Sequence, residues 1–172
     1  MNTIVIEKSK NNDFYQNAAF VVSACADKDD PRLVLQNVLI DNGKMIATDG
    51  NRLHLNDFTD SSLALENGQY SVTKTAKQIV LLPVNDPGNF PDYNRVIPLG
   101  EGAKTELSGN YIVEKIIAIV AIKNDGHAAV NLNYLKPIVD ANGPWTISTF
   151  EKLGPVKLQN CTKTAIIMPC NI

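Results

Sequence analysis

The chain has 172 residues, of which 44% are hydrophobic and 20% charged, a composition typical of a globular protein with a buried core. Its 16 lysines and arginines against 18 aspartates and glutamates leave a net charge of −2, which excludes a global basic field for nucleic acid. No apolar run approaches the ~20 residues that span a bilayer, and residues 1–8 lack the pattern of a signal peptide. The three cysteines, without metal-type spacing, indicate reduced thiols. We therefore expect one cytoplasmic domain with no membrane partner.

The first third of the chain predicts a strand, a helix and three further strands. The β-branched residues of 3–7 predict a strand, and apolar residues at helical spacing over 14–25 predict a helix capped by Asn11 or Asn12. Glycine in each of two short polar runs predicts a tight turn, at 41–43 and at 49–51. These turns separate the three strands expected at 32–40, 44–48 and 52–58.

The middle of the chain, residues 59–126, is expected to be a contracted join between two repeats. A strand is predicted over 69–72, a short helix over 74–82 capped by Thr73, and an ordered loop over 84–98, where aromatic residues stand between prolines. Residues 99–109 predict a loop with a short strand. The β-branched content of 111–122 fits a strand and the spacing of its isoleucines fits a helix; we favour the helix.

The last quarter repeats the order of the first. A strand is expected at 128–131, then a helix that is capped by Asn131 or Asn133 and ends at Asn142-Gly143. Because Pro137 lacks an amide hydrogen, this helix is expected to begin late. Strands follow at 145–149, 155–159 and 164–168. The result is an α+β protein of two βαβββ half-repeats with helices packed on antiparallel sheet, divided as 1–58, 59–126 and 127–172.

The sequence offers little for catalysis or metal binding. His54 and His127 have no partner at ligand spacing, and neither a nucleophile motif nor a phosphate loop is present. An unrelated enzyme that uses Asp49, Arg52 and Asp92 is a remote alternative. We therefore expect a protein that is not an enzyme and needs neither cofactor nor metal.

Three segments together resemble the bacterial sliding clamp, the β subunit of DNA polymerase III. Residues 47–53 read ATDGNRL and resemble the clamp's ATDGHRL, with Asn51 in place of the histidine. Residues 90–98 read FPDYNRVIP and resemble FPDYRRVLP, and residues 166–172 read IIMPCNI and resemble the clamp's final VVMPMRL. Weaker matches stand at 32–35 and 133–135. All occur in the clamp's order on a doubled strand–helix pattern, and the DNA-clamp fold is the fold that this resemblance implies.

The resemblance also implies a hydrophobic pocket for short linear peptides, because these three segments line such a pocket in the clamp family. Its ligands there are peptides of polymerases, the clamp loader and repair proteins. Asn51 is the position expected to alter partner preference. Carried over by motif, the peptide-binding pocket consists of Thr48, Gly50, Asn51, Arg52, Leu53, Pro91, Val96, Ile166, Met168 and Pro169.

Double-stranded DNA and a homo-oligomer are further implications, since clamp chains of three such domains close a ring around DNA. The candidate contacts to phosphate are Lys74, Lys77, Lys115, Lys123 and Lys136. A solvated surface is the alternative interpretation of these lysines, and the helix predicted over 14–25 carries no basic residue. The implied function is a replication accessory of the processivity-factor type, from a bacterium, phage or mobile element. The alternative is a peptide-binding adaptor, or competitor of the host clamp, that does not encircle DNA.

Overall fold

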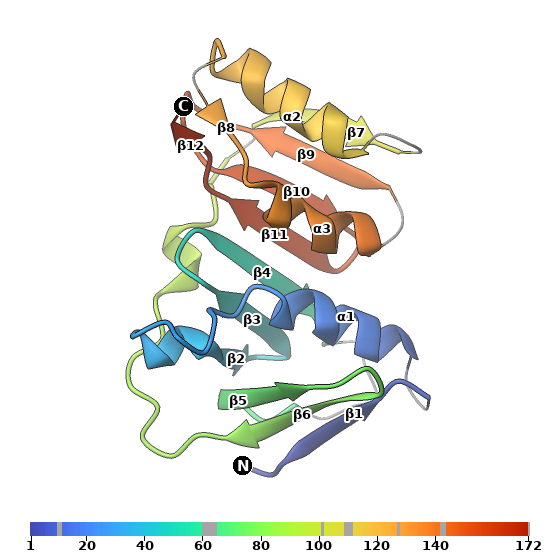
Figure 1. Ribbon diagram of the computed structural model, residues 1–172, viewed down its shortest axis with the longest axis vertical. Helices are drawn as coiled ribbons and strands as arrows, with labels where there is room; N and C mark the ends of the chain where they lie inside the picture. Colours follow the sequence, from blue (N-terminus) through green and yellow to red (C-terminus); the bar gives the residue numbers. More distant parts are fainter. Residues whose placement is uncertain are drawn as a thin grey trace. The chain divides into compact units, whose positions relative to one another are not determined.

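The computed structural model of the chain describes residues 1–9, 12–59, 65–100, 102–108, 112–126, 128–141 and 144–171. The contacts within the chain divide it into two units, Met1–Pro91 and Asp92–Ile172, which we call unit 1 and unit 2. Figure 1 labels the helices and strands of each unit. No helix among the described residues is both long enough and apolar enough to cross a membrane.

Unit 1 is an antiparallel sheet with one helix packed on it (Figure 1). Its strands follow the order β1-β6-β5-β2-β3-β4. Helix α1 contacts β3 and β4 and also β1 and β6, and it buries one apolar face that includes Phe14, Ala18 and Val21. The elements are β1 (Ile4–Glu7), α1 (Asn12–Val22), the 3-10 helix η1 (Leu33–Gln36), β2 (Asn37–Asp41), β3 (Lys44–Thr48), β4 (Arg52–Asp57), β5 (Gly68–Lys74) and β6 (Gln78–Pro83).

Two predictions for unit 1 are wrong in part or in full. The predicted strand over 32–40 begins only at Asn37, because η1 occupies its first half. The predicted helix over 74–82 is instead the end of β5, a turn and β6. Thr73, the expected cap, lies within β5. The hydroxyl that does accept a backbone amide is that of Thr75, which accepts the N–H of Gln78 at 3.1 Å and closes the turn. Buried Ile79 and Leu81 then alternate at the spacing of a strand.

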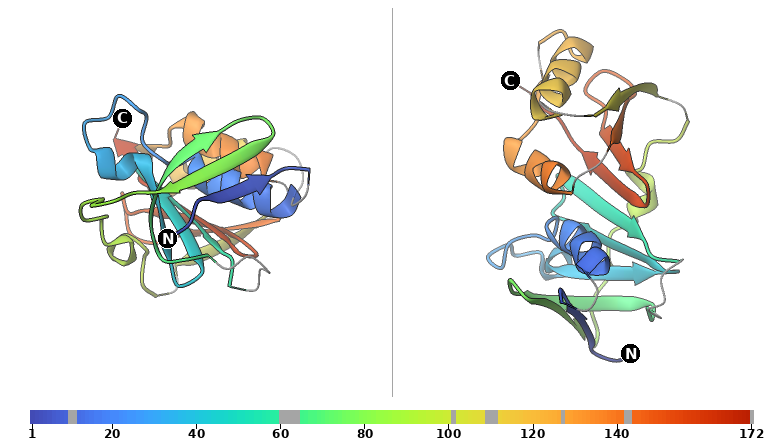
Figure 2. Two further views of the ribbon diagram at one scale, coloured as in Figure 1. Left: turned by 90° about the horizontal axis from the view of Figure 1, so that it is seen from below. Right: turned by 90° about the vertical axis from the view of Figure 1, so that its right-hand side faces the viewer.

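Unit 2 contains a four-stranded antiparallel sheet in the order β11-β10-β9-β7, and a small second sheet of β8 and β12. Helices α2 and α3 contact each other and cover one face of the four-stranded sheet (Figure 2). The elements are η2 (Tyr93–Arg95), β7 (Ala103–Leu107), α2 (Ile112–Lys123), β8 (Ala128–Ala129), α3 (Leu132–Asp140), β9 (Trp145–Thr149), β10 (Val156–Asn160), β11 (Lys163–Ile167) and β12 (Cys170–Asn171).

Helix α3 corrects the expectation drawn from Pro137. The Asn131 side chain caps the helix by accepting the Asn133 amide at 3.0 Å, so the helix begins at Leu132 and holds the proline in its interior. Pro137 removes one hydrogen bond to the Asn133 carbonyl. The cap and the buried side chains of Leu135 and Ile138 outweigh that loss.

The α+β class, with helices packed on antiparallel sheet, is confirmed. The expected joining segment 59–126 is shared between the units, since β5 and β6 pair within the sheet of unit 1 while β7 and α2 belong to unit 2. The division into half-repeats 1–58 and 127–172 stays a prediction. The expected cap at Asn11 and the expected helix end at Asn142-Gly143 lie outside the described residues.

The end of α2 is tied to the connection between β9 and β10. The buried Asn124 side chain donates to the Val120 carbonyl at 2.8 Å and accepts the Leu153 amide at 2.6 Å. An exposed ion pair joins Lys152 to Asp125 beside it, at 2.8 Å. These bonds provide partners for backbone groups at the end of α2 and in the following connection.

Candidate functional site

The turn between β3 and β4 is held by the side chains of Thr48 and Asp49. The Thr48 hydroxyl donates to the Arg52 carbonyl at 2.6 Å and accepts the Gly50 amide at 3.1 Å. One carboxylate oxygen of Asp49, Oδ1, accepts the amides of Asn51 and Arg52 at 2.9 and 3.0 Å. The tight turn predicted at 49–51 is therefore confirmed, and its polar side chains form it.

Gly50 has a backbone conformation that other residues adopt only with strain. Its φ is +92°, and a Cβ added there would lie 2.7 Å from Arg32 Nη1. Arg32 approaches closely because its Nη2 donates to the Asp49 carbonyl at 3.0 Å. The same guanidinium binds the Asp30 carboxylate through Nε and Nη2, which lowers the pKa of Asp30 to about 2.

Arg52 points toward the end of α1. Its Nε donates to Asp49 Oδ2 at 3.0 Å and its Nη2 donates to the Ser23 carbonyl at 2.6 Å. Only 13% of this side chain is exposed. A positive charge near the C-terminus of a helix is stabilising, but helix α1 has no basic residue in its last turn. Arg52, on the neighbouring strand β4, supplies that charge instead.

His54 completes this contact between β4 and α1. The buried imidazole stacks on the Phe20 ring at 4.3 Å, and its Nδ1 lies 2.8 Å from the Phe20 carbonyl and 3.2 Å from Ser23 Oγ. Burial is the main cause that lowers the pKa of His54, to about 3. The side chain is therefore neutral at physiological pH. Spacing along the sequence does not show that residues 23, 52 and 54 meet.

The remaining pocket candidates of unit 1 differ in accessibility. Leu53 is buried in β4, whereas Asn51 and Pro91 are exposed. The structure brings the candidates from Thr48 to Leu53 together around one turn. Pro91 lies further along the chain, after β6, at the end of unit 1.

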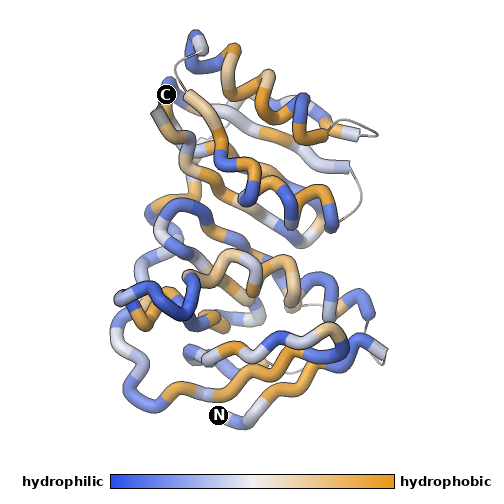
Figure 3. Tube along the Cα trace, in the orientation of Figure 1, coloured by the Kyte–Doolittle hydropathy of each residue, from blue (hydrophilic) through white to orange (hydrophobic). Residues whose placement is uncertain are grey.

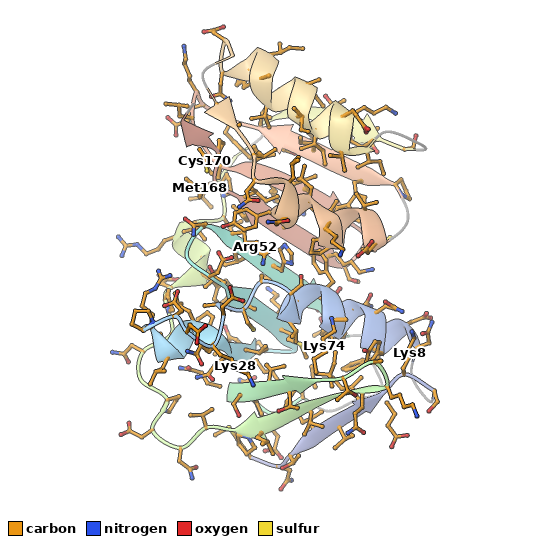
Figure 4. All side chains as sticks on the ribbon, viewed as in Figure 1. Lys8, Lys28, Arg52, Lys74, Met168 and Cys170 are labelled. Carbon is orange, nitrogen blue, oxygen red and sulfur yellow. The ribbon has the colours of Figure 1, made fainter. Side chains whose placement is uncertain are left out.

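The unit 2 candidates lie in two segments. Val96 is exposed after η2, and Ile166 is buried in β11. Met168 follows β11 with 40% of its surface exposed, and half-buried Pro169 leads into β12 (Figure 4). Because β12 pairs with β8, the segment that carries Met168 is anchored on both sides. Ile172, the last residue of the resembling segment, lies outside the described residues.

The five candidate lysines for DNA are all exposed and lie in three places, one in unit 1 and two in unit 2. Lys74 and Lys77 flank the turn between β5 and β6 in unit 1. In unit 2, two are on α2 and one is on α3: Lys115, Lys123 and Lys136. Most residues of α2 are hydrophobic (Figure 3), and Ile117 and Ile122 are exposed, Ile122 to 78%. This helix therefore presents apolar side chains between its lysines.

The side chains of the remote enzyme hypothesis make structural bonds. Asp49 and Arg52 bind each other within unit 1. Asp92, in unit 2, caps η2 by accepting the Asn94 amide at 3.1 Å. The part of the chain that the structure describes contains no group of three His, Cys, Asp or Glu side chains suited to a metal ion, and His127 lies outside it.

DNA sliding clamps share this architecture of antiparallel sheets with helices packed on them. More particularly, this chain has the fold of the β subunit of DNA polymerase III, and the resemblance seen in the sequence is confirmed. The Pseudomonas aeruginosa clamp with ligand matches 99% of this chain and 66% of its own, with a TM-score of 0.66 and 16% identity. The Borrelia burgdorferi β subunit in complex with a natural product matches 100% and 63%, with a TM-score of 0.63 and 16% identity.

A third structure, the Helicobacter pylori β clamp bound to a DNA ligase peptide, matches 99% of this chain and 66% of its own, with a TM-score of 0.59 and 13% identity. This chain thus spans about two thirds of the length of the clamps that it matches. No protein-family model and no curated protein matches the sequence. At sequence identities this low, the structural match establishes the fold alone. The activity and the partners of this chain are therefore proposals.

Proposed function

We propose that this chain is a clamp-like accessory of DNA replication that binds short linear peptides of polymerase or clamp-loader partners. The sliding-clamp fold over 99% of the chain supports this function, together with three segments that resemble the family's peptide-binding motifs. The Helicobacter pylori clamp, which shares the fold, is bound to a DNA ligase peptide. The proposed role is that of a processivity factor rather than an enzyme.

The proposed peptide contacts come from the exposed members of the assigned set. Met168 offers a flexible and polarizable apolar side chain, of the kind that adapts to different partners. Asn51 and Pro91 are exposed at unit 1 positions that the resemblance assigns to the same pocket. Leu53 in unit 1 and Ile166 in unit 2 are both buried and offer little surface of their own to a peptide.

We expect the DNA ligase peptide that binds the Helicobacter pylori clamp to bind this chain with a Kd on the order of micromolar. Replacing Met168 by alanine removes an exposed apolar contact and is expected to weaken binding by roughly tenfold. Fluorescence anisotropy with a labelled peptide measures both values. Ile122→Ala is the matched control, because it also removes an exposed apolar side chain but lies outside the assigned pocket. Equal affinity for Met168→Ala and the parent would contradict the assignment, and no binding to the parent would contradict the function.

A second candidate function is a peptide-binding adaptor that does not encircle DNA. The absence of lysine and arginine from α1, and the exposed Ile122 on α2, favour it, because a phosphate-binding surface needs basic side chains. Such an adaptor would keep the peptide site and could compete with a host clamp for partner peptides.

Light scattering and DNA titration separate these two functions. If the chain forms a ring on DNA through the five candidate lysines, we expect a multimer, and a DNA affinity that falls roughly 500-fold between about 50 and about 200 mM salt. That loss follows from the counterions released at about five phosphate contacts. Two results together would contradict the processivity role: a chain that stays monomeric at high protein concentration, and a DNA affinity that does not depend on salt. The peptide-binding adaptor would then be the remaining candidate function.

A further inference from the structure

We propose that Arg52 is a positioning residue, which holds the β3–β4 turn against the end of α1 and does not itself contact the peptide. This inference rests on the proposed peptide-binding function, and it assigns to Arg52 a role different from that of its exposed neighbour Asn51. It concerns contacts within unit 1 alone.

The direction of the guanidinium is the first support. Its Nε and Nη2 bind two acceptors on different segments, Asp49 Oδ2 in the turn and the Ser23 carbonyl after α1. The side chain is only 13% exposed, so little of its surface is open to a ligand. A planar guanidinium has donors in fixed directions and can satisfy both acceptors at once, which a single ammonium cannot do in the same geometry.

The end of α1 supplies the second support. The Phe20 carbonyl accepts the Ser23 hydroxyl at 2.6 Å and lies 2.8 Å from His54 Nδ1. Arg52 binds the Ser23 carbonyl three residues later. Two side chains of β4 thus provide partners for carbonyls that the helix itself leaves open at its C-terminus. The bond from Arg52 is the one that also reaches the turn.

Asp49 connects Arg52 to the shape of the turn. Its Oδ1 accepts two backbone amides, its Oδ2 accepts Arg52 Nε, and its carbonyl accepts Arg32 Nη2. Without the Arg52 guanidinium, the Asp49 carboxylate loses the partner that links it to α1. The turn would keep its Thr48 hydrogen bonds but would no longer be held at the end of α1. Exposed Asn51 would then occupy its binding position for a smaller fraction of the time.

This mechanism has a kinetic signature. When only a fraction of the molecules has the binding-competent conformation, the apparent affinity equals the intrinsic affinity multiplied by that fraction. Loop motions take nanoseconds to microseconds. Where such exchange is faster than binding, the loss appears in the association rate. The dissociation rate is set by the contacts in the complex, and these remain intact if Arg52 does not touch the peptide. A lost direct contact would instead accelerate dissociation.

The experiment measures association and dissociation of the fluorescent DNA ligase peptide by stopped flow, with Arg52→Met, Asp49→Asn and the double variant. Each single variant is expected to slow association by roughly tenfold and to leave dissociation within about twofold of the parent. The double variant is expected to bind the peptide as well as the single variant of lower affinity does, because both substitutions break the same connection.

Two further variants sharpen this result. Arg52→Lys keeps the positive charge without the two fixed donor directions, and it is expected to behave like Arg52→Met. Asn124→Ala removes a buried bond in unit 2 and lowers stability without touching the turn, so it is expected to leave both rates unchanged. This control separates positioning from general destabilisation.

The proposal is overturned if Arg52→Met accelerates dissociation, or if Arg52→Lys restores affinity, since either result assigns a direct contact to Arg52. Parent-like kinetics in every variant would also overturn it, because the turn would then be held without Arg52. If Arg52→Met does not fold, Asp49→Asn and Arg52→Lys carry the same comparison.

A parent protein that binds no peptide contradicts the proposed function and, with it, the effect on binding. Amide hydrogen exchange at residues 50–52 then tests the holding role separately. Faster exchange in Arg52→Met than in the parent supports it, and unchanged exchange overturns it.

Discussion

Replacing Trp145 by alanine is expected to lower the free energy of unfolding by about 3–5 kcal/mol. Trp145 begins β9, pairs with Leu107 of β7, and is fully buried beneath the helices of unit 2. Alanine removes the apolar surface of the indole from the core and leaves a cavity that the surrounding strands and helices close only in part. Urea unfolding followed by far-ultraviolet circular dichroism measures the change, because this variant loses the only tryptophan of the chain.

Ile122→Ala is the control for this loss of stability. It removes an apolar side chain from the same unit at a position that is 78% exposed, so the expected change is within about 0.5 kcal/mol. A loss below about 1 kcal/mol for Trp145→Ala would contradict the placement of the indole at the centre of the core, since even smaller buried side chains cost more than that.

Acidification from about pH 7 to about pH 5 is expected to cost about 2 kcal/mol of stability through His54 alone. In the folded chain, burial lowers the pKa of His54 from 6.5 to about 3. The unfolded chain therefore binds a proton below about pH 6.5 that the folded chain does not bind, and stability falls as the pH falls through this range. The loss continues until the pH reaches the folded-state pKa.

Urea unfolding at several pH values tests this prediction, with His54→Asn as the comparison. The asparagine amide can donate to the Phe20 carbonyl in place of Nδ1 but does not titrate. The variant is expected to be less stable at pH 7, because it loses the stacking on Phe20, and to show a much flatter dependence between pH 7 and pH 5. The same pH dependence in both proteins would show that another group causes it.

The structure changes what the motif at 47–53 means. By resemblance, Thr48, Asn51 and Arg52 belong to a peptide pocket. In the structure, Thr48 makes the turn together with Asp49, and Arg52 joins the turn to α1. Asn51 is the exposed polar side chain that these bonds leave at the tip. It is also the position where the sequence departs from the clamp motif, so we expect partner preference to depend on it.

Most strands, and both turns between β2 and β4, could be predicted from local pattern. The turn at 41–43 has Asn42 and Gly43 at positive φ, a conformation that these residue types adopt at little cost. Helix α2 was also predictable in type, because its isoleucines follow helical spacing. Where a residue's own preference decides the structure, the sequence is sufficient.

Other elements depend on neighbours that are distant in sequence. The short strand β12 exists because it pairs with β8, about 40 residues earlier, and two residues have no strand signal of their own. Thr75 has the chemistry of both a helix cap and a turn, and the pairing of β5 with β6 selects the turn. Local preferences amount to fractions of a kcal/mol per residue, so burial and strand pairing override them.

The sequence by itself determined the turn at 49–51, the alternation of apolar residues that builds the sheets, and the motifs that resemble the sliding clamp. Only the tertiary structure decided where Arg52 and His54 point, because their partners lie at the end of α1, 29 to 34 residues away along the chain. Turn residues act through their own backbone preferences, which are local. A buried guanidinium or imidazole must find its partners in whatever segment the fold brings beside it, and that choice is made by the packing of the whole unit.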